Sequence, residues 1–206
     1  MHIQILTVGP LQTNCYLLVK EQQVLIIDPG AEFAKIQKAI QQTAAQPIAI
    51  LLTHGHFDHI GAVEETRSYY QIPLYMGEKD SKWLSDPSHN LSEFIGEPII
   101  CQAAEYTFSH DEHVSIGPFD FHVRLTPGHT PGSVSYVFDS DKMVFTGDCL
   151  FAGAIGRTDF PGGQPAIIHD TIKEKLFSLP MNYSIYPGHG SHSTIATEKR
   201  NNPFFQ

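Results

Sequence analysis

The feature that most constrains this chain is the stretch THGHFDH at positions 53–59, which places three histidines and an aspartate within six residues. It directly follows the apolar run IAILL at 48–52, a pattern typical of a buried strand. Such a strand delivers imidazoles and a carboxylate to its own end. Because neutral imidazole nitrogens and carboxylate oxygens are ligands of divalent metal ions, the spacing predicts a metal site that the rest of the chain must support.

Composition indicates a folded chain. Its 206 residues are 41% hydrophobic and 17% charged, without a low-complexity tract. This length is enough for a two-sheet core, and we expect a single domain over residues 1–206. The formal net charge is −9 and lysine and arginine never cluster, which disfavours nucleic acid and anionic membranes as partners.

Nothing in the chain resembles a targeting or membrane segment. Residues 1–10 lack a basic region followed by a long apolar one, and no later stretch approaches the roughly 20 apolar residues of a membrane span. We therefore expect a cytoplasmic protein. Cys15, Cys101 and Cys149 lack Cys-x-x-Cys spacing, so neither a disulfide framework nor a structural zinc knuckle is indicated.

Apolar patterning predicts strands and helices of an α/β protein. Strands are expected at residues 3–8, 15–19, 24–27, 48–52, 73–76, 119–125, 133–138, 143–146 and 183–186. Helices are expected at 32–45, about 60–70, 79–84 and 165–179. The short apolar segments 106–108 and 114–116 flank a polar turn, so they are predicted to form a hairpin.

Three later strands also end in ligand-type residues, which are His129, Asp148 and His189. Strand ends are where α/β sheets place their chemistry. His54 and His56 are two residues apart, so in an extended backbone they point the same way and can bind one ion. Asp58 and His59 follow where the backbone turns, so they can face a neighbouring position. His129 can then complete the first site and His189 the second, with Asp148 between them.

The order and spacing of these seven side chains resemble the full ligand set of the metallo-β-lactamase fold hydrolases. The likeness extends along the chain through QTNCY at 12–16, IIDPG at 26–30 and TGD at 146–148. GRTDFPGG at 156–163 and the segment 198–205 are similar to small bacterial members of the glyoxalase II-like branch. The resemblance implies a four-layer αββα sandwich of two mixed β-sheets flanked by helices, with a dinuclear site in a groove at one edge.

The resemblance also implies a role for each residue. It assigns the first metal to His54, His56 and His129, the second to Asp58, His59 and His189, and both to Asp148. Two cations about 3.5 Å apart lower the pKa of a shared water from about 15.7 toward neutrality and polarise a substrate carbonyl. Asp58 is expected to orient the resulting hydroxide or its proton. Zn²⁺ is the expected metal, with iron and manganese as alternatives.

The implied function is hydrolysis of a small-molecule thioester such as S-lactoylglutathione, whose thiolate leaves without a dedicated general acid. The persulfide dioxygenase family also resembles this chain and shares the GRTDF stretch, which implies one iron held by His54, His129 and Asp148. A lactonase or β-lactamase-like hydrolase, or a non-enzymatic member of the fold, stays open as well. The sequence predicts no oligomeric state.

Some of these residues have plainer interpretations. A closed structural zinc site is one interpretation of residues 54–59, but nitrogen and oxygen donors without cysteines favour an open site. Asp58 is also a candidate N-cap of the next helix. Arg157 offers a fork to a substrate carboxylate, whereas an ion pair with Asp159 is the alternative. Cys149 is expected in the core, because adjacent strand residues face opposite ways.

Overall fold

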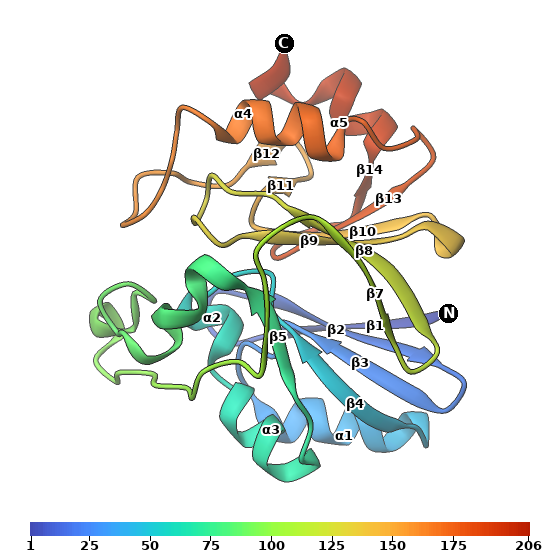
Figure 1. The fold of residues 1–206 in the computed structure, drawn as a ribbon, viewed down its shortest axis with the longest axis vertical. Helices are drawn as coiled ribbons and strands as arrows, with labels where there is room; N and C mark the ends of the chain where they lie inside the picture. The colour runs from blue at the N-terminus through green and yellow to red at the C-terminus, as the bar shows by residue number, and fades with distance from the viewer.

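Two six-stranded β-sheets lie face to face at the centre of the computed structural model, which describes residues 1–206 (Figure 1). The N-terminal sheet has the order β1-β2-β3-β4-β5-β6. Its strands are β1 (His2–Val8), β2 (Thr13–Lys20), β3 (Gln23–Ile27), β4 (Gln46–Leu51), β5 (Leu74–Gly77) and β6 (Tyr106–Phe108). The first three strands pair antiparallel, and the remaining pairs are parallel.

The C-terminal sheet has the order β14-β13-β10-β9-β8-β7. Its strands are β7 (Glu112–Ile116), β8 (Phe119–Leu125), β9 (Val134–Phe138), β10 (Met143–Gly147), β13 (Ser184–Pro187) and β14 (Ser193–Thr194). Only β10 and β13 pair parallel, so this sheet is mixed as well. A small hairpin of β11 (Leu150–Phe151) and β12 (Ala154–Ile155) follows β10.

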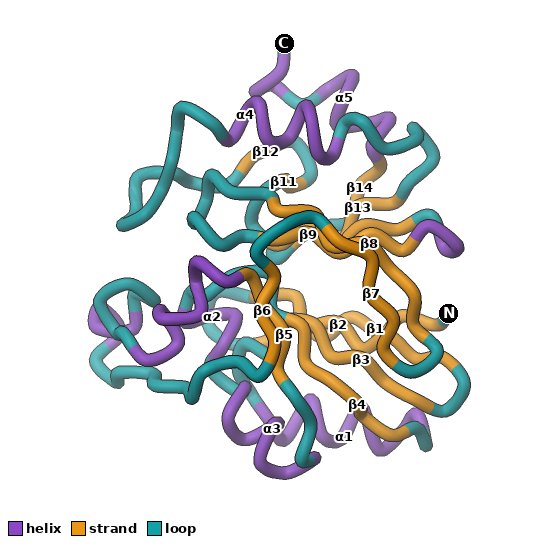
Figure 2. The backbone as a smooth tube through the Cα atoms, in the orientation of Figure 1, coloured by secondary structure: helices purple, strands orange, loops and turns teal.

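Helices cover the outer face of each sheet (Figures 1 and 2). The α-helices are α1 (Phe33–Thr43), α2 (Phe57–Ile60), α3 (Val63–Tyr70), α4 (Ile168–Thr171) and α5 (Ile195–Asn201). Shorter turns are the 3-10 segments η1 (Glu78–Ser85), η2 (Ser92–Ile95), η3 (Asp139–Asp141) and η5 (Pro203–Phe205), with the π-helical η4 (Ile172–Leu176) continuing α4. None of these helices has the length and apolar character that a membrane span requires. The four-layer αββα arrangement is confirmed.

Three apolar cores explain why the strand sequences are so uniformly hydrophobic. The inner core joins the two sheets and contains Leu25 and Leu51 from one and Tyr136 and Phe145 from the other. The outer cores pack α1 and α3, or α4 and α5, against the sheets. Because both faces of the central strands are buried, they form continuous apolar runs instead of alternating patterns. Cys149 lies in an outer core, as predicted.

The predicted hairpin of residues 106–116 is wrong. β6 runs parallel to β5 in the N-terminal sheet, whereas β7 pairs with β8 in the C-terminal sheet. Tyr106 stacks on Tyr75 with ring centroids 4.5 Å apart, so side-chain packing between neighbouring strands replaces the expected local pairing. The turn between β6 and β7 therefore connects the two sheets.

Two helix predictions also change. The helix expected at about 60–70 is divided into α2 and α3 at Gly61, where a β-carbon would lie 2.3 Å from the carbonyl oxygen of Gly30. The helix expected at 165–179 begins at Ile168 and is π-helical in its second half. The single-domain organisation stays a prediction.

Candidate metal centre

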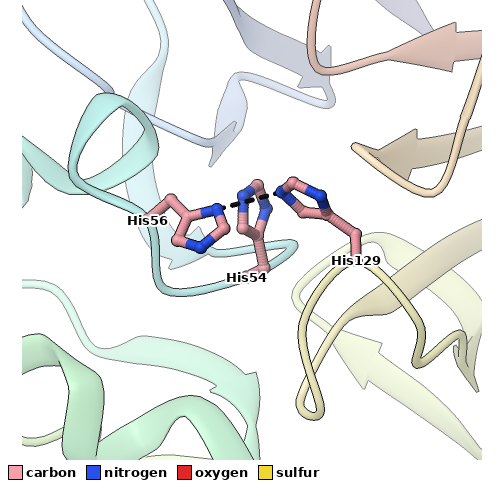
Figure 3. Close-up of side chains that lie close together, drawn as sticks. All are labelled: His54, His56 and His129. Carbon is pink, nitrogen blue, oxygen red and sulfur yellow. Dashed lines mark hydrogen bonds between the residues drawn. The ribbon is translucent and has the colours of Figure 1, made fainter. Parts of the chain in front are cut away.

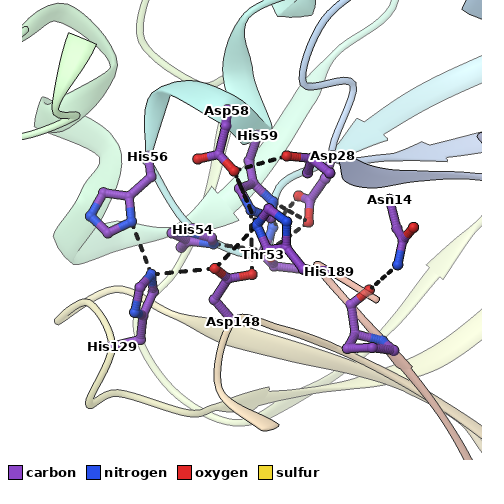
Figure 4. A network of polar contacts seen from close by, with 12 residues as sticks. Asn14, Asp28, Thr53, His54, His56, Asp58, His59, His129, Asp148 and His189 are labelled. Carbon is purple, nitrogen blue, oxygen red and sulfur yellow. Dashed lines mark hydrogen bonds and ion pairs between the residues drawn. The ribbon is translucent and has the colours of Figure 1, made fainter. Parts of the chain in front are cut away.

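The strand ends that carry the predicted ligands meet at one edge of the sandwich (Figure 4). The N-terminal sheet supplies the β4–α2 loop and α2, which carry His54, His56, Asp58 and His59. The C-terminal sheet supplies the segments after β8, β10 and β13, which carry His129, Asp148 and His189. All seven predicted residues are brought together, in overlapping groups whose donor atoms lie within 4.8 Å of one another or in direct contact.

The first group consists of His54, His56 and His129 (Figure 3). Nδ1 of His56 lies 2.9 Å from Nε2 of His129. The ring of His54 lies with its centroid 4.8 Å from that of His56 and 4.9 Å from that of His129. All three side chains are buried, so the group presents nitrogen donors away from bulk water.

The second group consists of Asp58, His59 and His189. Nε2 of His189 lies 3.1 Å from Oδ2 of Asp58, and Nε2 of His59 lies 3.5 Å from the same oxygen. The Asp148 carboxylate lies between the groups, with Oδ1 3.4 Å from His59 Nε2 and Oδ2 3.7 Å from His129 Nε2. This is the position from which one carboxylate can contact two ions.

These distances fit a divalent cation. A tetrahedral ion with bonds of about 2.0–2.1 Å separates neighbouring donor atoms by about 3.3–3.4 Å. The separations of 3.4 and 3.5 Å around His59 Nε2 are closer to that value than to an N–H···O bond of about 2.9 Å. Moreover, His54 Nε2, His59 Nε2 and Asp148 Oδ1 are buried and have no hydrogen-bond partner, which a bound cation accounts for.

Hydrogen bonds from the chain orient the ligand imidazoles. Three of them contact an oxygen through Nδ1, and the acceptors are Asp28 Oδ2 for His59 at 2.9 Å, Arg157 O for His129 at 2.7 Å and Leu11 O for His189 at 3.1 Å. Because carbonyl and carboxylate oxygens only accept, Nδ1 must carry the proton in these pairs. The Nε2 lone pair is then directed to the donor group, which is the form that binds a metal.

Asp28 is the functional residue that the sequence analysis missed. It is 1% exposed and accepts from Thr53 N at 2.8 Å, from Thr53 Oγ1 at 2.7 Å and from His59. Thr53 Oγ1 lies 3.1 Å from His54 Nδ1 and, as its proton is given to Asp28, it accepts there. Asp28 thus orients histidines of both groups. The Asp-Pro-Gly sequence at the end of β3 is typical of a turn, and Asp28 adopts a left-handed φ of 50°.

The electrostatic environment differs between the groups. Burial and the neighbouring imidazoles lower the pKa of His54, and they lower the pKa of His56 to about 3, so both are neutral. Burial opposes protonation of His59 as well, but the carboxylates of Asp58, Asp148 and Asp28 outweigh it and raise its pKa. Bonds to Asp148 and Asp58 likewise outweigh burial and raise the pKa of His189 to about 10. The second group therefore concentrates negative charge suited to a cation.

Asp58 is not the N-cap of α2, so that interpretation is wrong. The N-cap is His56, and Asp58 lies in the first turn of the helix. Its Oδ2 faces His189 and accepts a hydrogen bond of 2.8 Å from Thr13 Oγ1. The helix start thus turns this carboxylate toward the donor cluster instead of toward its own backbone.

A cavity of about 500 Å³ opens over the donor cluster. Its walls are largely apolar and include Leu11, Phe57, Leu91, Phe151, Ala152, Ala154, Ile155 and Phe160. Arg157 also lines it, but its guanidinium binds Asp159 at 2.9 and 2.7 Å and lies 4.2 Å above the ring of Phe160. The alternative ion pair is therefore formed, and contact of Arg157 with substrate stays a prediction.

Comparisons with known proteins agree with this geometry. The family model of the metallo-β-lactamase superfamily matches residues 8–189. The probable metallo-hydrolase YqgX of Bacillus subtilis is 43% identical over 198 residues, which are 96% of this chain and 94% of that protein. The hydroxyacylglutathione hydrolase GloC of Haemophilus influenzae is 36% identical over 207 residues, which are 99% and 98% of the two chains.

Solved structures are similar over the same length. BLEG-1, a B3 metallo-β-lactamase, has a TM-score of 0.97 at 39% identity and covers 100% of both chains. TTHA1623 in a di-iron-bound form has a TM-score of 0.86 at 36% identity over 98% of this chain and 99% of that one. ETHE1 from Myxococcus xanthus has a TM-score of 0.82 at 30% identity over 98% and 84%. Family model, relatives and structures together show that this chain belongs to the metallo-β-lactamase superfamily.

Proposed function

We propose that this metallo-hydrolase superfamily member is a thioester hydrolase of the glyoxalase II type, acting on S-lactoylglutathione or a related acyl thioester. The observation that carries the proposal is the arrangement of seven nitrogen and oxygen donors in two groups that share Asp148, at the floor of an apolar cavity. The name of the GloC relative supports the choice of substrate, because its similarity extends over 98% of that protein.

We further propose that the centre holds two divalent cations, with zinc as the metal. His54, His56 and His129 would hold one, Asp58, His59 and His189 the other, and Asp148 both. Bound divalent cations lower the pKa of water and polarise a carbonyl oxygen. The di-iron form of TTHA1623 supports iron as an alternative, and this donor set also suits manganese.

Asp58 is the residue we assign to orienting the attacking water. The bond from Thr13 and the contact with His189 both use Oδ2, so Oδ1 remains for a water proton. Asp58 also lines the cavity that opens over the donor groups, so a water bound there lies within reach of this side chain. Thr13 holds the carboxylate in one orientation and reduces the freedom that it would otherwise lose on binding.

The cavity suits an acyl thioester. Its volume of about 500 Å³ is in the range of small-molecule sites, which is about 300–1,000 Å³. Apolar walls such as Phe151 and Phe160 limit water around the reacting carbonyl, which strengthens electrostatic interactions there. A thiolate leaves without a proton donor, so this reaction needs no dedicated general acid.

Two relatives support other chemistries. Similarity to ETHE1 supports the persulfide dioxygenase alternative, in which His54, His129 and Asp148 hold one iron, and His129 Nε2 and Asp148 Oδ2 are 3.7 Å apart. Similarity to BLEG-1 supports β-lactam hydrolysis. The hydrolase proposal is preferred because the second group, Asp58, His59 and His189, is complete and contacts Asp148.

One panel of assays tests the proposal. Metal-free protein is loaded with zinc or iron and assayed for S-lactoylglutathione hydrolysis, persulfide-dependent oxygen uptake and hydrolysis of a chromogenic cephalosporin. We expect thioester hydrolysis with zinc to be the fastest reaction, and its loss in His189→Ala. The matched control is His192→Ala, because His192 is exposed and stacks on Tyr186 outside the donor groups. Oxygen uptake that exceeds hydrolysis would refute the proposal.

A further inference from the structure

Each donor group is assembled from two sheets. In the first group, His54 and His56 follow β4 in the N-terminal sheet, whereas His129 follows β8 in the C-terminal sheet. In the second group, His189 follows β13 and must meet ligands on α2. Neither group can keep its geometry unless something fixes the loops of one sheet against those of the other.

Asp80, in η1, connects the two loops of the first group. Its carboxylate is fully buried. Oδ2 accepts from Gly55 N at 3.1 Å and from Thr130 Oγ1 at 2.6 Å, and Oδ1 accepts from Gly132 N at 2.7 Å. Gly55 lies between His54 and His56, and Thr130 follows His129. One carboxylate thus holds both loops by three hydrogen bonds without contacting a donor nitrogen.

The contact leaves no room for larger residues. A β-carbon on Gly132 would lie 2.6 Å from Asp80 Oδ1 and 2.4 Å from its backbone nitrogen. A β-carbon on Gly77 would lie 1.9 Å from the carbonyl oxygen of Gly132. Gly132 therefore brings the backbone of the C-terminal sheet into direct contact with Asp80, at a distance that only glycine permits.

Asn14, in β2, connects the second group in the same manner. It is 5% exposed, and its Nδ2 donates to the carbonyl oxygens of Pro187 at 3.1 Å and Gly190 at 2.9 Å. Its backbone nitrogen donates to Gly188 O at 2.7 Å. These three carbonyls bracket His189, so Asn14 holds the turn that carries this ligand at three points.

We propose that Asp80 and Asn14 are positioning residues with separate tasks: Asp80 sets the affinity of the first metal and Asn14 that of the second. The inference rests on the two-ion centre proposed above and is independent of the substrate. Partners that orient metal ligands from outside the coordination sphere typically contribute 10–100-fold to metal affinity. We expect each substitution to lower the affinity for one ion by about this factor and the affinity for the other ion by less than about threefold.

Asp80→Asn keeps the shape of the side chain but removes an acceptor. If the amide oxygen keeps the bond to Gly132, its NH₂ group takes the place of Oδ2. Thr130 can then accept instead of donate, but Gly55 N–H faces a second donor. The substitution therefore breaks the bond to the loop between His54 and His56, while the bonds to Thr130 and Gly132 remain.

Asn14→Ala removes two donors and leaves the carbonyl of Pro187 satisfied, because Tyr16 Oη also donates to it. The change loosens the turn around His189 without adding a buried charge. The matched control is Asn90→Ala. Asn90 is likewise buried, and its side chain donates to two backbone carbonyls, those of Trp83 and Ile99. Its own carbonyl accepts from Phe57 N, a bond that alanine keeps, and it contacts neither ligand loop of the C-terminal sheet.

The test is titration of metal-free full-length proteins with cobalt(II), whose visible spectrum depends on donor set and geometry. His129→Ala and His189→Ala identify the spectral signature of each group. Circular dichroism and thermal unfolding of the metal-free variants report folding. We expect Asp80→Asn to lose the signature lost in His129→Ala, Asn14→Ala to lose that lost in His189→Ala, and Asn90→Ala to keep both.

Several outcomes would overturn the inference. It is wrong if both variants lower the affinity for both ions equally, or if both lower the affinity for the same ion. It is also wrong if Asn90→Ala loses the same spectral signature because the protein is less stable. It is also wrong if both variants bind cobalt as the unsubstituted protein does. Failure of the unsubstituted protein to bind two ions would instead refute the dinuclear centre, so the two failures are distinguishable.

Discussion

Substitution of Asp28 by Asn tests how the chain holds its ligand histidines in the metal-binding form. The side chain accepts three hydrogen bonds, two of them from Thr53 and one of 2.9 Å from His59 Nδ1. Asn keeps the size and tolerates the left-handed φ of 50° at this position. The change therefore acts on hydrogen bonding, with the backbone preserved.

The expected loss follows from which bonds remain. If the amide oxygen keeps the bond to Thr53 N, the NH₂ group faces Thr53 Oγ1, which can accept, and His59 Nδ1–H, which cannot. His59 must then move its proton to Nε2, the nitrogen directed at the second group. A hydrogen bond to a charged group contributes about 1.5–3 kcal/mol. At about 1.4 kcal/mol per factor of ten, binding of the second ion weakens by roughly 10–150-fold.

Zinc affinity measured by competition with a chromophoric chelator at fixed pH checks this value. Asp111→Asn is the matched control, because Asp111 is exposed, pairs with Lys175, accepts from Leu125 N at the end of β8 and contacts no residue of the donor groups. We expect the control to bind both ions as the unsubstituted protein does. Two ions bound to Asp28→Asn within about threefold of normal affinity would refute the reasoning.

Three further predictions follow from the site. Burial opposes protonation of His189, but bonds to Asp148 and Asp58 raise its pKa to about 10, so zinc uptake at neutral pH should release at least one proton. Zinc affinity should therefore rise at least about tenfold per pH unit from about pH 7 to 9. Calorimetry in buffers of different ionisation enthalpy counts the released protons, and zinc binding without proton release would contradict this prediction. Gly188→Ala should abolish binding of the second ion, measured by elemental analysis, because its β-carbon would lie 2.1 Å from Asp148 Oδ1. Arg157→Ala should raise KM for S-lactoylglutathione about tenfold at constant kcat if the guanidinium binds a substrate carboxylate. An unchanged KM would show that Arg157 does not contact substrate and pairs only with Asp159.

Local sequence patterns predicted many of the strands and the residues of the donor groups. The continuous apolar runs at 24–27 and 48–52 predicted strands, and β3 and β4 are strands whose apolar residues are largely buried. His54 and His56 follow a strand at the spacing that directs both side chains to one side, and the structure places them so. Patterns within about ten residues were sufficient in these cases.

What the sequence did not predict depends on contacts between distant segments. Segments 106–108 and 114–116 are adjacent in sequence, yet they join different sheets because each packs on a different neighbouring strand. Asp80 has no local pattern to distinguish it from the charged residues around it, and its partners lie 25 to 52 residues away. Arg157 was selected for its side chain, whereas its carbonyl oxygen orients His129, and backbone groups have no sequence signature.

The central claim is that the donor groups hold two cations that act together on a thioester. Its most direct test is stoichiometric titration of the metal-free protein with zinc, followed by the rate of S-lactoylglutathione hydrolysis at each step. We predict that the rate rises to a plateau that begins at two zinc ions per chain. A plateau at one ion, or full zinc loading without hydrolysis, would contradict the account.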